Sequence, residues 1–406
     1  MIKKAGLIGL VFGLLLGVIS PVPVQAQGGL TVLDSSTQIA FPDELNFSLS
    51  ARSNVNITDI RLHYTVDRLS FAQVTSEVYV EFEPATTVEA EWTWDMRRTG
   101  GLPPGTSVAY WWTVEDAQGN RVATAPARVH FDDTRYRWQS LTEGNVNLRW
   151  YKGDESFARG LMAVAQETLT RLAEDTGAVL ERPVDIYIYA DSQELQGSLI
   201  FPQEWTGGVA FTRFGIIAIG IPPNQLEWGK RAMSHELAHL VIHQMTFNPY
   251  IELPTWLDEG LAMYAEGSLE FVFFNRLNQA VVEGTLISVR SLASPFSAHA
   301  EESVLAYAQS YSLVEFLINS YGQSRMLELL LTFKEGSGYD AALEKVYGFD
   351  MDGLDSLWRG QFAPPAQPTE KAGLPMALVG ALAAPGSGIL LALGLDVKRR
   401  DWGQGW

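Results

Sequence analysis

The chain has 406 residues, of which 47% are hydrophobic and 19% are charged, and its formal net charge is −18. This length favours two or three structural units over one, and so acidic a chain repels phosphate backbones, so we expect no nucleic-acid partner. The sequence contains no cysteine, which excludes disulfides, thiol chemistry and thiolate zinc sites and leaves His, Asp and Glu as the available metal ligands.

Residues 1–26 have the features of a secretory signal peptide. An apolar run follows Lys3 and Lys4 and ends at Val24-Gln25-Ala26, a small-x-small cleavage site. An uncleaved membrane anchor is the alternative, but the apolar run is short for a membrane span and two prolines follow it. We therefore expect the body of the protein to lie outside the cytoplasm.

Residues 28–135 have the pattern of a β-domain. Apolar and polar residues alternate with a period of two at 60–66 and 108–114, and a turn cluster stands at 103–106. Short strands at this spacing predict a β-sandwich. The stretch 102–122 resembles a fibronectin-III or immunoglobulin-like domain. It contains no catalytic constellation, so we expect a spacer or substrate-presenting module.

A second unit, residues 138–363, combines a small sheet with many helices. The pattern predicts strands at 146–150 and 184–190, an amphipathic helix at 155–176, and one or two strands within 207–221. The remainder of the unit is almost entirely helical in pattern. A small sheet followed by a run of helices predicts the α+β class.

The segment His235-Glu236-Leu237-Ala238-His239 carries the pattern HExxH within a predicted helix at 226–244. Positions i and i+4 of a helix lie about 40° apart and about 6 Å along the axis. Two imidazoles at this spacing can bind one Zn²⁺ ion, so we predict His235 and His239 as metal ligands. Glu236 is offset by one residue. It can reach the zinc-activated water without binding the metal, which suits a general base.

A catalytic zinc needs a third protein ligand, and a second predicted helix offers one. This helix starts at Pro254, and Glu259 follows His239 with 19 residues between them. HELAH followed by WLDEGLAMYAEG resembles the gluzincin metallopeptidases, above all the peptidase-MA-like group related to thermolysin and aminopeptidase N. The resemblance implies that Glu259 is the third ligand. The metzincin pattern is absent, because Ile242 and Met245 stand where it requires Gly and His.

The resemblance covers residues 138–363 and includes a segment upstream of HExxH. Residues 205–210 are similar to the strand that lines the active-site cleft in this group, where a substrate backbone adds as a further strand. The resemblance therefore implies three substrate-binding residues, Gly207, Gly208 and Val209.

Related gluzincins hold the oxyanion of the tetrahedral intermediate with a Tyr or His side chain, which has a clear electrostatic value. Downstream of the metal ligands, residues 307–314 resemble the corresponding helix of the group. Tyr311 is our candidate for this catalytic role. No motif separates it from Tyr307, and core packing is the alternative reading.

Three further polar residues lie close to the metal ligands in the sequence. We expect Asp258 to orient a ligand histidine, with an exposed acid at a helix start as the alternative, and the same two readings apply to Glu266. His243 lies about 12 Å along the helix axis from His235, too far to share one zinc ion. We therefore expect His243 to be a core or capping residue.

The C-terminal region has the pattern of a membrane anchor. Residues 372–395 are predominantly apolar and a basic cluster follows them directly, which predicts a transmembrane helix and a cytoplasmic tail at 396–406. A short polar linker, 364–371, precedes it. The alternative is a processed sorting tail. The expected location is the cell membrane, as a single-pass protein whose catalytic domain is extracytoplasmic.

Together these predictions describe a membrane-anchored zinc peptidase that hydrolyses peptide bonds in a peptide or protein substrate. Two alternative functions remain open. One is a non-catalytic surface module, for binding or structure, that contains zinc. The other is a hydrolase of a non-protein substrate or of cell-wall peptide cross-links.

Overall fold

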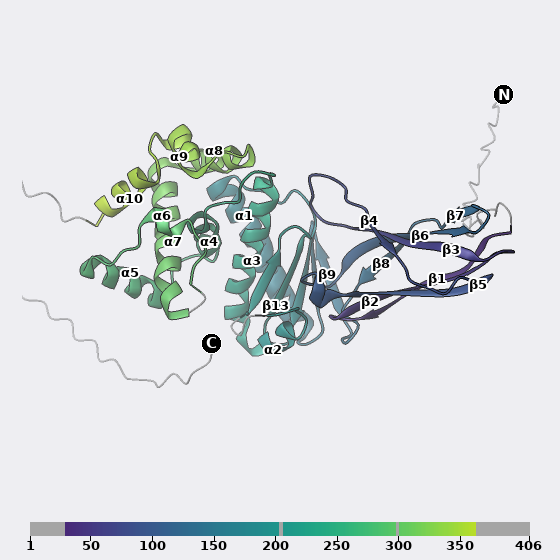
Figure 1. Cartoon of the computed structure of the whole chain (residues 1–406). Coiled ribbons are helices and arrows are strands. Elements are labelled where there is room, and N and C mark those ends of the chain that lie inside the picture. The colour runs from purple at the N-terminus through teal and green to yellow at the C-terminus, as the bar shows by residue number, and fades with distance from the viewer. Residues whose placement is uncertain (1–28, 203–205, 298–299, 363–406) are drawn as a thin grey trace, which may run out of the picture. The chain divides into compact units, whose positions relative to one another are not determined.

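A computed structural model describes residues 29–202, 206–297 and 300–362, and its sheets and helices confirm the predicted α+β class. The chain divides into two compact units, Met1–Arg135 and Tyr136–Trp406. The described helices of four or more residues all belong to the second unit (Figure 1).

The first unit is built from two antiparallel sheets. Its strands are β1 (Thr31–Ala40), β2 (Glu44–Arg52), β3 (Ile57–Val66), β4 (Ser76–Tyr79), β5 (Thr87–Asp95), β6 (Thr106–Asp116), β7 (Arg121–Ala123) and β8 (Ala127–Phe131), with a 3-10 helix at Met96–Arg98. One sheet has the order β1-β2-β5, and the other has the order β4-β3-β6-β7, with β8 also paired to β6.

Alternating side chains form the core between these two sheets. In β2, Leu45, Phe47 and Leu49 are buried, and in β6 the buried residues include Tyr110 and Trp112. The rings of Phe47 and Tyr110 lie 5.1 Å apart between centroids, so the two sheets pack face to face. The period-two pattern therefore forms a β-sandwich, as expected for strands with one buried face.

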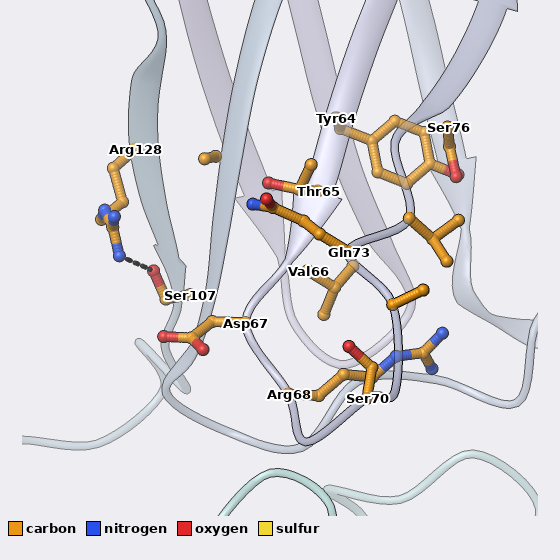
Figure 2. A pocket seen from close by; sticks show the side chains of 13 residues that line it. Tyr64, Thr65, Val66, Asp67, Arg68, Ser70, Gln73, Ser76, Ser107 and Arg128 are labelled. Carbon is orange, nitrogen blue, oxygen red and sulfur yellow. Dashed lines mark hydrogen bonds between the residues drawn. The ribbon is translucent and has the colours of Figure 1, made fainter. Parts of the chain in front are cut away.

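A polar pocket of about 280 Å³ opens on the first unit, where the chain leaves β3 and returns to β4. Its walls include Tyr64, Asp67, Gln73 and Arg128 (Figure 2). None of its lining residues belongs to the HExxH segment or to the helix that follows it, so it is separate from the candidate metal site.

A five-stranded sheet begins the second unit. Its strands are β9 (Gln139–Glu143), β10 (Val146–Trp150), β11 (Val184–Tyr189), β12 (Gly208–Phe211) and β13 (Ile216–Gly220), in the order β12-β13-β11-β10-β9. The three central strands are parallel, and both edge strands are antiparallel to their neighbours. Strands β10, β11, β12 and β13 lie within the predicted ranges, whereas β9 was not predicted.

Helices cover this sheet and form the rest of the unit. They are α1 (Glu155–Thr176), α2 (Ser192–Gln196), α3 (Leu226–Thr246), α4 (Thr255–Ala265), α5 (Phe271–Glu283), α6 (Val289–Leu292), α7 (Ala300–Tyr321), α8 (Gln323–Lys334), α9 (Tyr339–Tyr347) and α10 (Met351–Gly360). Buried residues of β10, β11 and β13 share one hydrophobic core with residues of α1 and α3.

Local signals set the limits of the helices that matter most. Asp154 caps α1 by accepting a hydrogen bond from the backbone N–H of Phe157, and Gly177 ends this helix with φ +74°. Pro254 immediately precedes α4. Gly260 lets α4 approach α7 closely, because a Cβ atom there would lie 2.5 Å from the backbone oxygen of Ser310. The packing therefore fixes the position of the residue beside it, Glu259.

The predicted membrane localisation is wrong. Among the described residues, none of the helices combines the length and the apolarity that a membrane crossing requires. Helices α1, α3 and α7 are long enough, at 22, 21 and 22 residues, but charged residues such as Glu167, Arg231 and Glu315 interrupt them. This finding contradicts a single-pass membrane localisation, and it gives no support to a membrane partner. The predicted segments 1–26, 364–371, 372–395 and 396–406 lie outside the described residues.

Candidate metal centre

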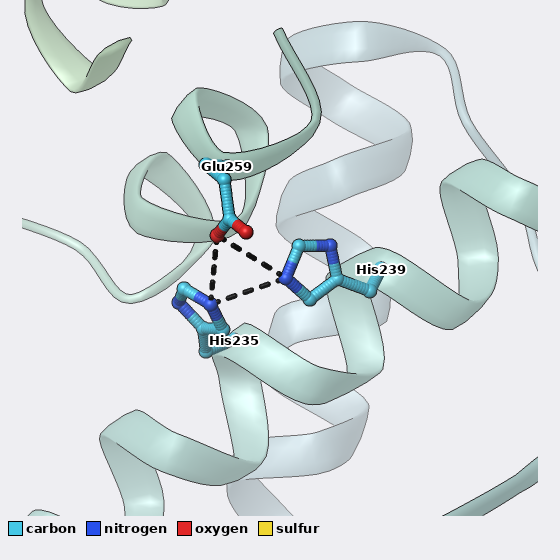
Figure 3. A group of neighbouring side chains, drawn as sticks. All are labelled: His235, His239 and Glu259. Atoms are coloured by element: carbon cyan, nitrogen blue, oxygen red, sulfur yellow. Dashed lines mark hydrogen bonds and ion pairs between the residues drawn. The ribbon is translucent and has the colours of Figure 1, made fainter. Parts of the chain in front are cut away.

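Helices α3 and α4 bring the three predicted ligands together (Figure 3). The Nε2 atoms of His235 and His239 are 3.2 Å apart. Oε2 of Glu259 lies 3.4 Å from Nε2 of His235 and 3.5 Å from Nε2 of His239. In a tetrahedral zinc site with bonds of about 2.0–2.1 Å, ligand atoms are about 3.3–3.4 Å apart, so the triangle has the right size for one ion.

Two carboxylates determine which ring nitrogens face this triangle. Nδ1 of His235 lies 2.9 Å from Oε1 of Glu266, and Nδ1 of His239 lies 2.9 Å from Oδ1 of Asp258. An ionised carboxylate only accepts hydrogen bonds, so each Nδ1 carries the proton and donates it. In the neutral form that binds a metal, each imidazole then has its lone pair on Nε2. Asp258 and Glu266 are therefore placed to orient the two histidines.

The protonation of the three atoms that face one another shows whether a metal ion fits among them. Nε2 of His235, Nε2 of His239 and Oε2 of Glu259 all have lone pairs and point at one another. Oε2 of Glu259 is buried and has no hydrogen-bond partner among the described residues. Three such acceptors at this separation repel one another unless a cation lies between them. The donor set, two imidazoles and one carboxylate, is typical of catalytic zinc.

The charges around His235, His239 and Glu259 favour a positive charge between these three side chains. Burial lowers the pKa of His235, but the nearby carboxylates of Glu259 and Glu266 outweigh burial and raise it to about 9. Burial raises the pKa of Glu259, but His239 and His235 outweigh it and lower that pKa to about 2. A divalent cation would supply this positive charge and displace the imidazole protons.

The carboxylate of Glu236 lies against the edge strand β12. A Cβ atom on Gly208 would lie 2.6 Å from Oε1 of Glu236, so the glutamate occupies the space that the glycine leaves. The carboxylate also accepts a hydrogen bond from the backbone N–H of Ala210. Burial raises the pKa of Glu236, and the charge of Glu259 adds to the increase. Both effects favour a carboxylate that accepts and releases a proton.

The predicted substrate-binding residues lie on or beside β12. The N–H of Gly220 donates to the carbonyl of Gly207 at 3.0 Å, so the backbone groups of Gly207 and Val209 face β13. Those of Gly208 and Ala210 face the opposite way. Within the described sheet β12 is an edge strand, so this side is the one open to a further strand.

The two candidate tyrosines differ in their surroundings. The hydroxyl of Tyr311 donates to Oε1 of Glu315 at 3.1 Å, and burial and Glu315 raise its pKa to about 12. Burial also raises the pKa of Tyr307, followed by the charges of Glu259 and Glu236. Tyr307 lies one helical turn before Tyr311, and of the two tyrosines it is the one whose pKa responds to the charges of Glu259 and Glu236.

Sequence reasoning gave His243 no role in the site and did not single out Arg231. Nε2 of His243 lies 3.0 Å from Oδ2 of Asp258, and Nη2 of Arg231 lies 2.9 Å from Oε2 of Glu266. A signal for both was present, because residues 231, 235, 239 and 243 recur every four positions along one helix.

A family comparison adds to this geometry. Residues 164–363 match the sequence pattern of the peptidase MA superfamily. The second unit belongs to that superfamily. The match covers α3 and α4, and membership of this gluzincin-type family was predicted from HELAH and WLDEGLAMYAEG.

Solved structures and curated proteins add less than the superfamily match. None of the curated proteins matches the chain. OgpA from Akkermansia muciniphila is similar at 12% identity and a TM-score of 0.21, with 28% of this chain and 30% of that chain covered. An M1 zinc metallopeptidase from Deinococcus radiodurans is similar at 14% identity and a TM-score of 0.31, with 84% and 96% covered. A two-domain M1 zinc metallopeptidase bound to L-arginine is similar at 13% identity and a TM-score of 0.36, with the same coverage. This chain thus spans about a third of the length of OgpA.

Proposed function

We propose that this member of the peptidase MA superfamily hydrolyses peptide bonds with one zinc ion held by His235, His239 and Glu259. One observation carries the proposal. The partly buried side chains of His235, His239 and Glu259 place three lone-pair atoms 3.2–3.5 Å apart, and the carboxylate of Glu236, the residue after His235, lies against the neighbouring strand β12. A purely structural zinc site has no need of that free carboxylate.

Zinc at this centre would supply Lewis-acid chemistry, acidifying a water and polarising the scissile carbonyl. The protein supplies the proton transfers. Glu236 accepts the proton of the attacking water and then gives it to the leaving amine. The raised pKa of Glu236 matches this double role, because a stronger base takes the first proton more readily.

The open side of β12 is our proposed substrate-binding edge. The outward backbone groups of Gly208 and Ala210 would pair with an extended substrate, which needs no particular side chain. The N–H of Ala210 already binds Glu236, which leaves the carbonyl groups and the N–H of Gly208 for the substrate. Gly207 and Val209 would then act through the strand geometry they give to Gly208.

The general-base role is tested by replacing Glu236 with Gln. We expect the Glu236→Gln protein to bind zinc like the wild type, because Glu236 is not a ligand, and to lose peptide cleavage by at least about 10²-fold. Zinc content and cleavage of casein or a peptide library are measured on the same preparations. Wild-type zinc binding without any cleavage would instead favour a non-catalytic module. Full cleavage by the Glu236→Gln protein would reject the mechanism.

The oxyanion role is tested at both tyrosines. We propose Tyr307 in place of Tyr311, because the phenol of Tyr311 is already bonded to Glu315. Removing one oxyanion donor lowers kcat by about 10²–10³-fold, so we expect this from Tyr307→Phe, with zinc affinity unchanged. Tyr311→Phe is the matched control and should retain most activity. The reverse order of the two variants would return the role to Tyr311.

For the first unit we propose the fibronectin-III or immunoglobulin-like fold, acting as a spacer or substrate-presenting module. The division of its strands supports this proposal, with β1, β2 and β5 in one sheet and β3, β4 and β6 in the other. In β-sandwiches of this kind, alternate residues of each strand face the buried core between the sheets, and the loops cluster at the two ends.

A further inference from the structure

Helix α3 carries four polar residues in one row. Arg231, His235, His239 and His243 are spaced by four positions, so each lies about 6 Å along the axis from the next and on nearly the same face. The two inner residues are the proposed ligands. Each of the two outer residues contacts a carboxylate that in turn holds a ligand histidine.

At one end of the row, Asp258 connects two histidines. Its Oδ1 accepts from Nδ1 of His239 at 2.9 Å, and its Oδ2 lies 3.0 Å from Nε2 of His243. The ionised carboxylate has no proton to give, so His243 must donate. Both oxygens of Asp258 therefore have a fixed donor, and the carboxylate plane cannot rotate without breaking one of these bonds.

At the other end of the row, Glu266 connects a ligand histidine to the guanidinium of Arg231 in the same way. Oε1 of Glu266 accepts from Nδ1 of His235 at 2.9 Å, and Oε2 of Glu266 pairs with Nη2 of Arg231 at 2.9 Å. Nε of Arg231 also pairs with Oε1 of Glu270 at 3.0 Å, which fixes the plane of the guanidinium. A planar fork of this kind is specific to arginine, because lysine offers a single point charge.

We propose that Arg231 and His243 are positioning residues that lock Glu266 and Asp258, and through them the two ligand histidines, in the metal-binding orientation. The inference rests on the proposed function, since it assigns the row to the same zinc site. The physical reason is geometric: a histidine binds a metal well only when its ring plane is held, and the carboxylate on its far nitrogen holds it. Each outer residue fixes that carboxylate.

A second metal ion beside Asp258 is the alternative to the positioning role proposed for His243. His239, His243 and Asp258 also have ligand atoms within 4.8 Å of one another, which is close enough to hold an ion of their own. That ion would have to displace the protons that Nδ1 of His239 and Nε2 of His243 now donate to Asp258. The two possibilities predict different zinc stoichiometries.

The experiment measures zinc affinity on the purified full chain by competition with a chromophoric chelator, beside unfolding of the zinc-free protein. The variants are His243→Ala, His243→Gln, Arg231→Ala and Arg231→Lys, with Arg159→Ala as the control. Arg159 pairs with Glu155 on the exposed surface of α1, so its loss should leave zinc affinity unchanged. The Gln amide can donate to Asp258 from the position of Nε2, so it preserves the hydrogen bond without a ring.

We expect one zinc per wild-type chain, about tenfold weaker binding in both Ala variants, near wild-type affinity in His243→Gln, and intermediate affinity in Arg231→Lys. A merely structural role would change unfolding of the zinc-free protein and leave affinity unaltered, and that result would overturn the inference. Two zinc ions per wild-type chain, falling to one in His243→Ala, would also overturn it. If an Ala variant does not fold, the Gln and Lys variants decide. A wild type that binds no zinc would reject the proposed function itself, whereas unchanged affinity in all four variants rejects only the lock.

Discussion

At the scale of single residues, Gly208 and Glu236 depend on each other. The glutamate lies against the backbone of β12, where a Cβ atom at position 208 would come within 2.6 Å of its Oε1 atom. Contacts that short do not occur, so any larger residue must displace the carboxylate. The glycine thus sets the position of the proposed general base without touching the metal ligands.

We therefore predict that Gly208→Ala lowers kcat/KM by roughly 10²-fold, since a displacement of about 1 Å is enough for such a loss. Zinc content should stay at the wild-type level, because the ligands lie on α3 and α4. Steady-state kinetics and metal analysis of one preparation test both parts. Gly338→Ala is the control, because nothing lies within 4 Å of a Cβ atom there. Wild-type activity in Gly208→Ala would contradict the proposed position of the base.

The sequence predicted the residues of the site unevenly. His235, Glu236 and His239 follow from spacing within one helix, which is a local property. Nothing local separates Tyr307 from Tyr311, because the difference arises from how α7 docks on α4, where Gly260 meets the backbone of Ser310. The partner of His243 was equally hidden, since Asp258 comes from another helix.

At the scale of elements, the turn between β6 and β7 is organised around one buried carboxylate. Asp116 accepts hydrogen bonds from the hydroxyl of Ser53 at 2.7 Å and from the backbone N–H groups of Gln118 and Asn120, each at 3.0 Å. Burial raises the pKa of Asp116, but the hydrogen bonds from Asn120 and Ser53 outweigh burial and lower it. The ionised form therefore stabilises the folded turn.

The sign of the pH dependence follows from that lowered pKa. An unfolded aspartate titrates near about 3.9, so Asp116 stabilises the fold above this pH and ceases to do so as pH falls through its lower folded value. We predict that Asp116→Asn is less thermostable than the wild type at pH 7 and that the difference shrinks below about pH 4. Calorimetry of the intact chain at both pH values measures it, with exposed Glu91→Gln as the control. A difference that grows on acidification would contradict the assignment.

Element limits were predictable where the chain carries its own stop signals. Helix α1 runs from Glu155 to Thr176, as predicted, because Asp154 caps its start and Gly177 its end. The edge position of β12 was implied by the family resemblance and not by a local signal, because strand order depends on pairing between distant segments. Yet that order decides which backbone groups remain open for a substrate.

At the scale of the whole molecule, each unit contains buried apolar residues of its own. Phe47 and Trp112 are buried in the first unit, and Leu237 and Trp256 in the second. The proposed zinc ligands all belong to the second unit. The free energy of zinc binding is therefore available to the folding of that unit alone, because a ligand stabilises only the structure that binds it.

We predict two calorimetric transitions for the intact chain, of which zinc raises one. A free zinc concentration of 100 times Kd adds about 2.7 kcal/mol to the unit that binds it, and a chelator should remove that gain. Glu259→Ala, which lacks the third ligand, should lose most of the shift. Asp116→Asn identifies the other transition, because its effect is confined to the sandwich. If zinc raised the transition that Asp116→Asn lowers, or raised neither, the zinc site would not belong to the fold of the second unit alone.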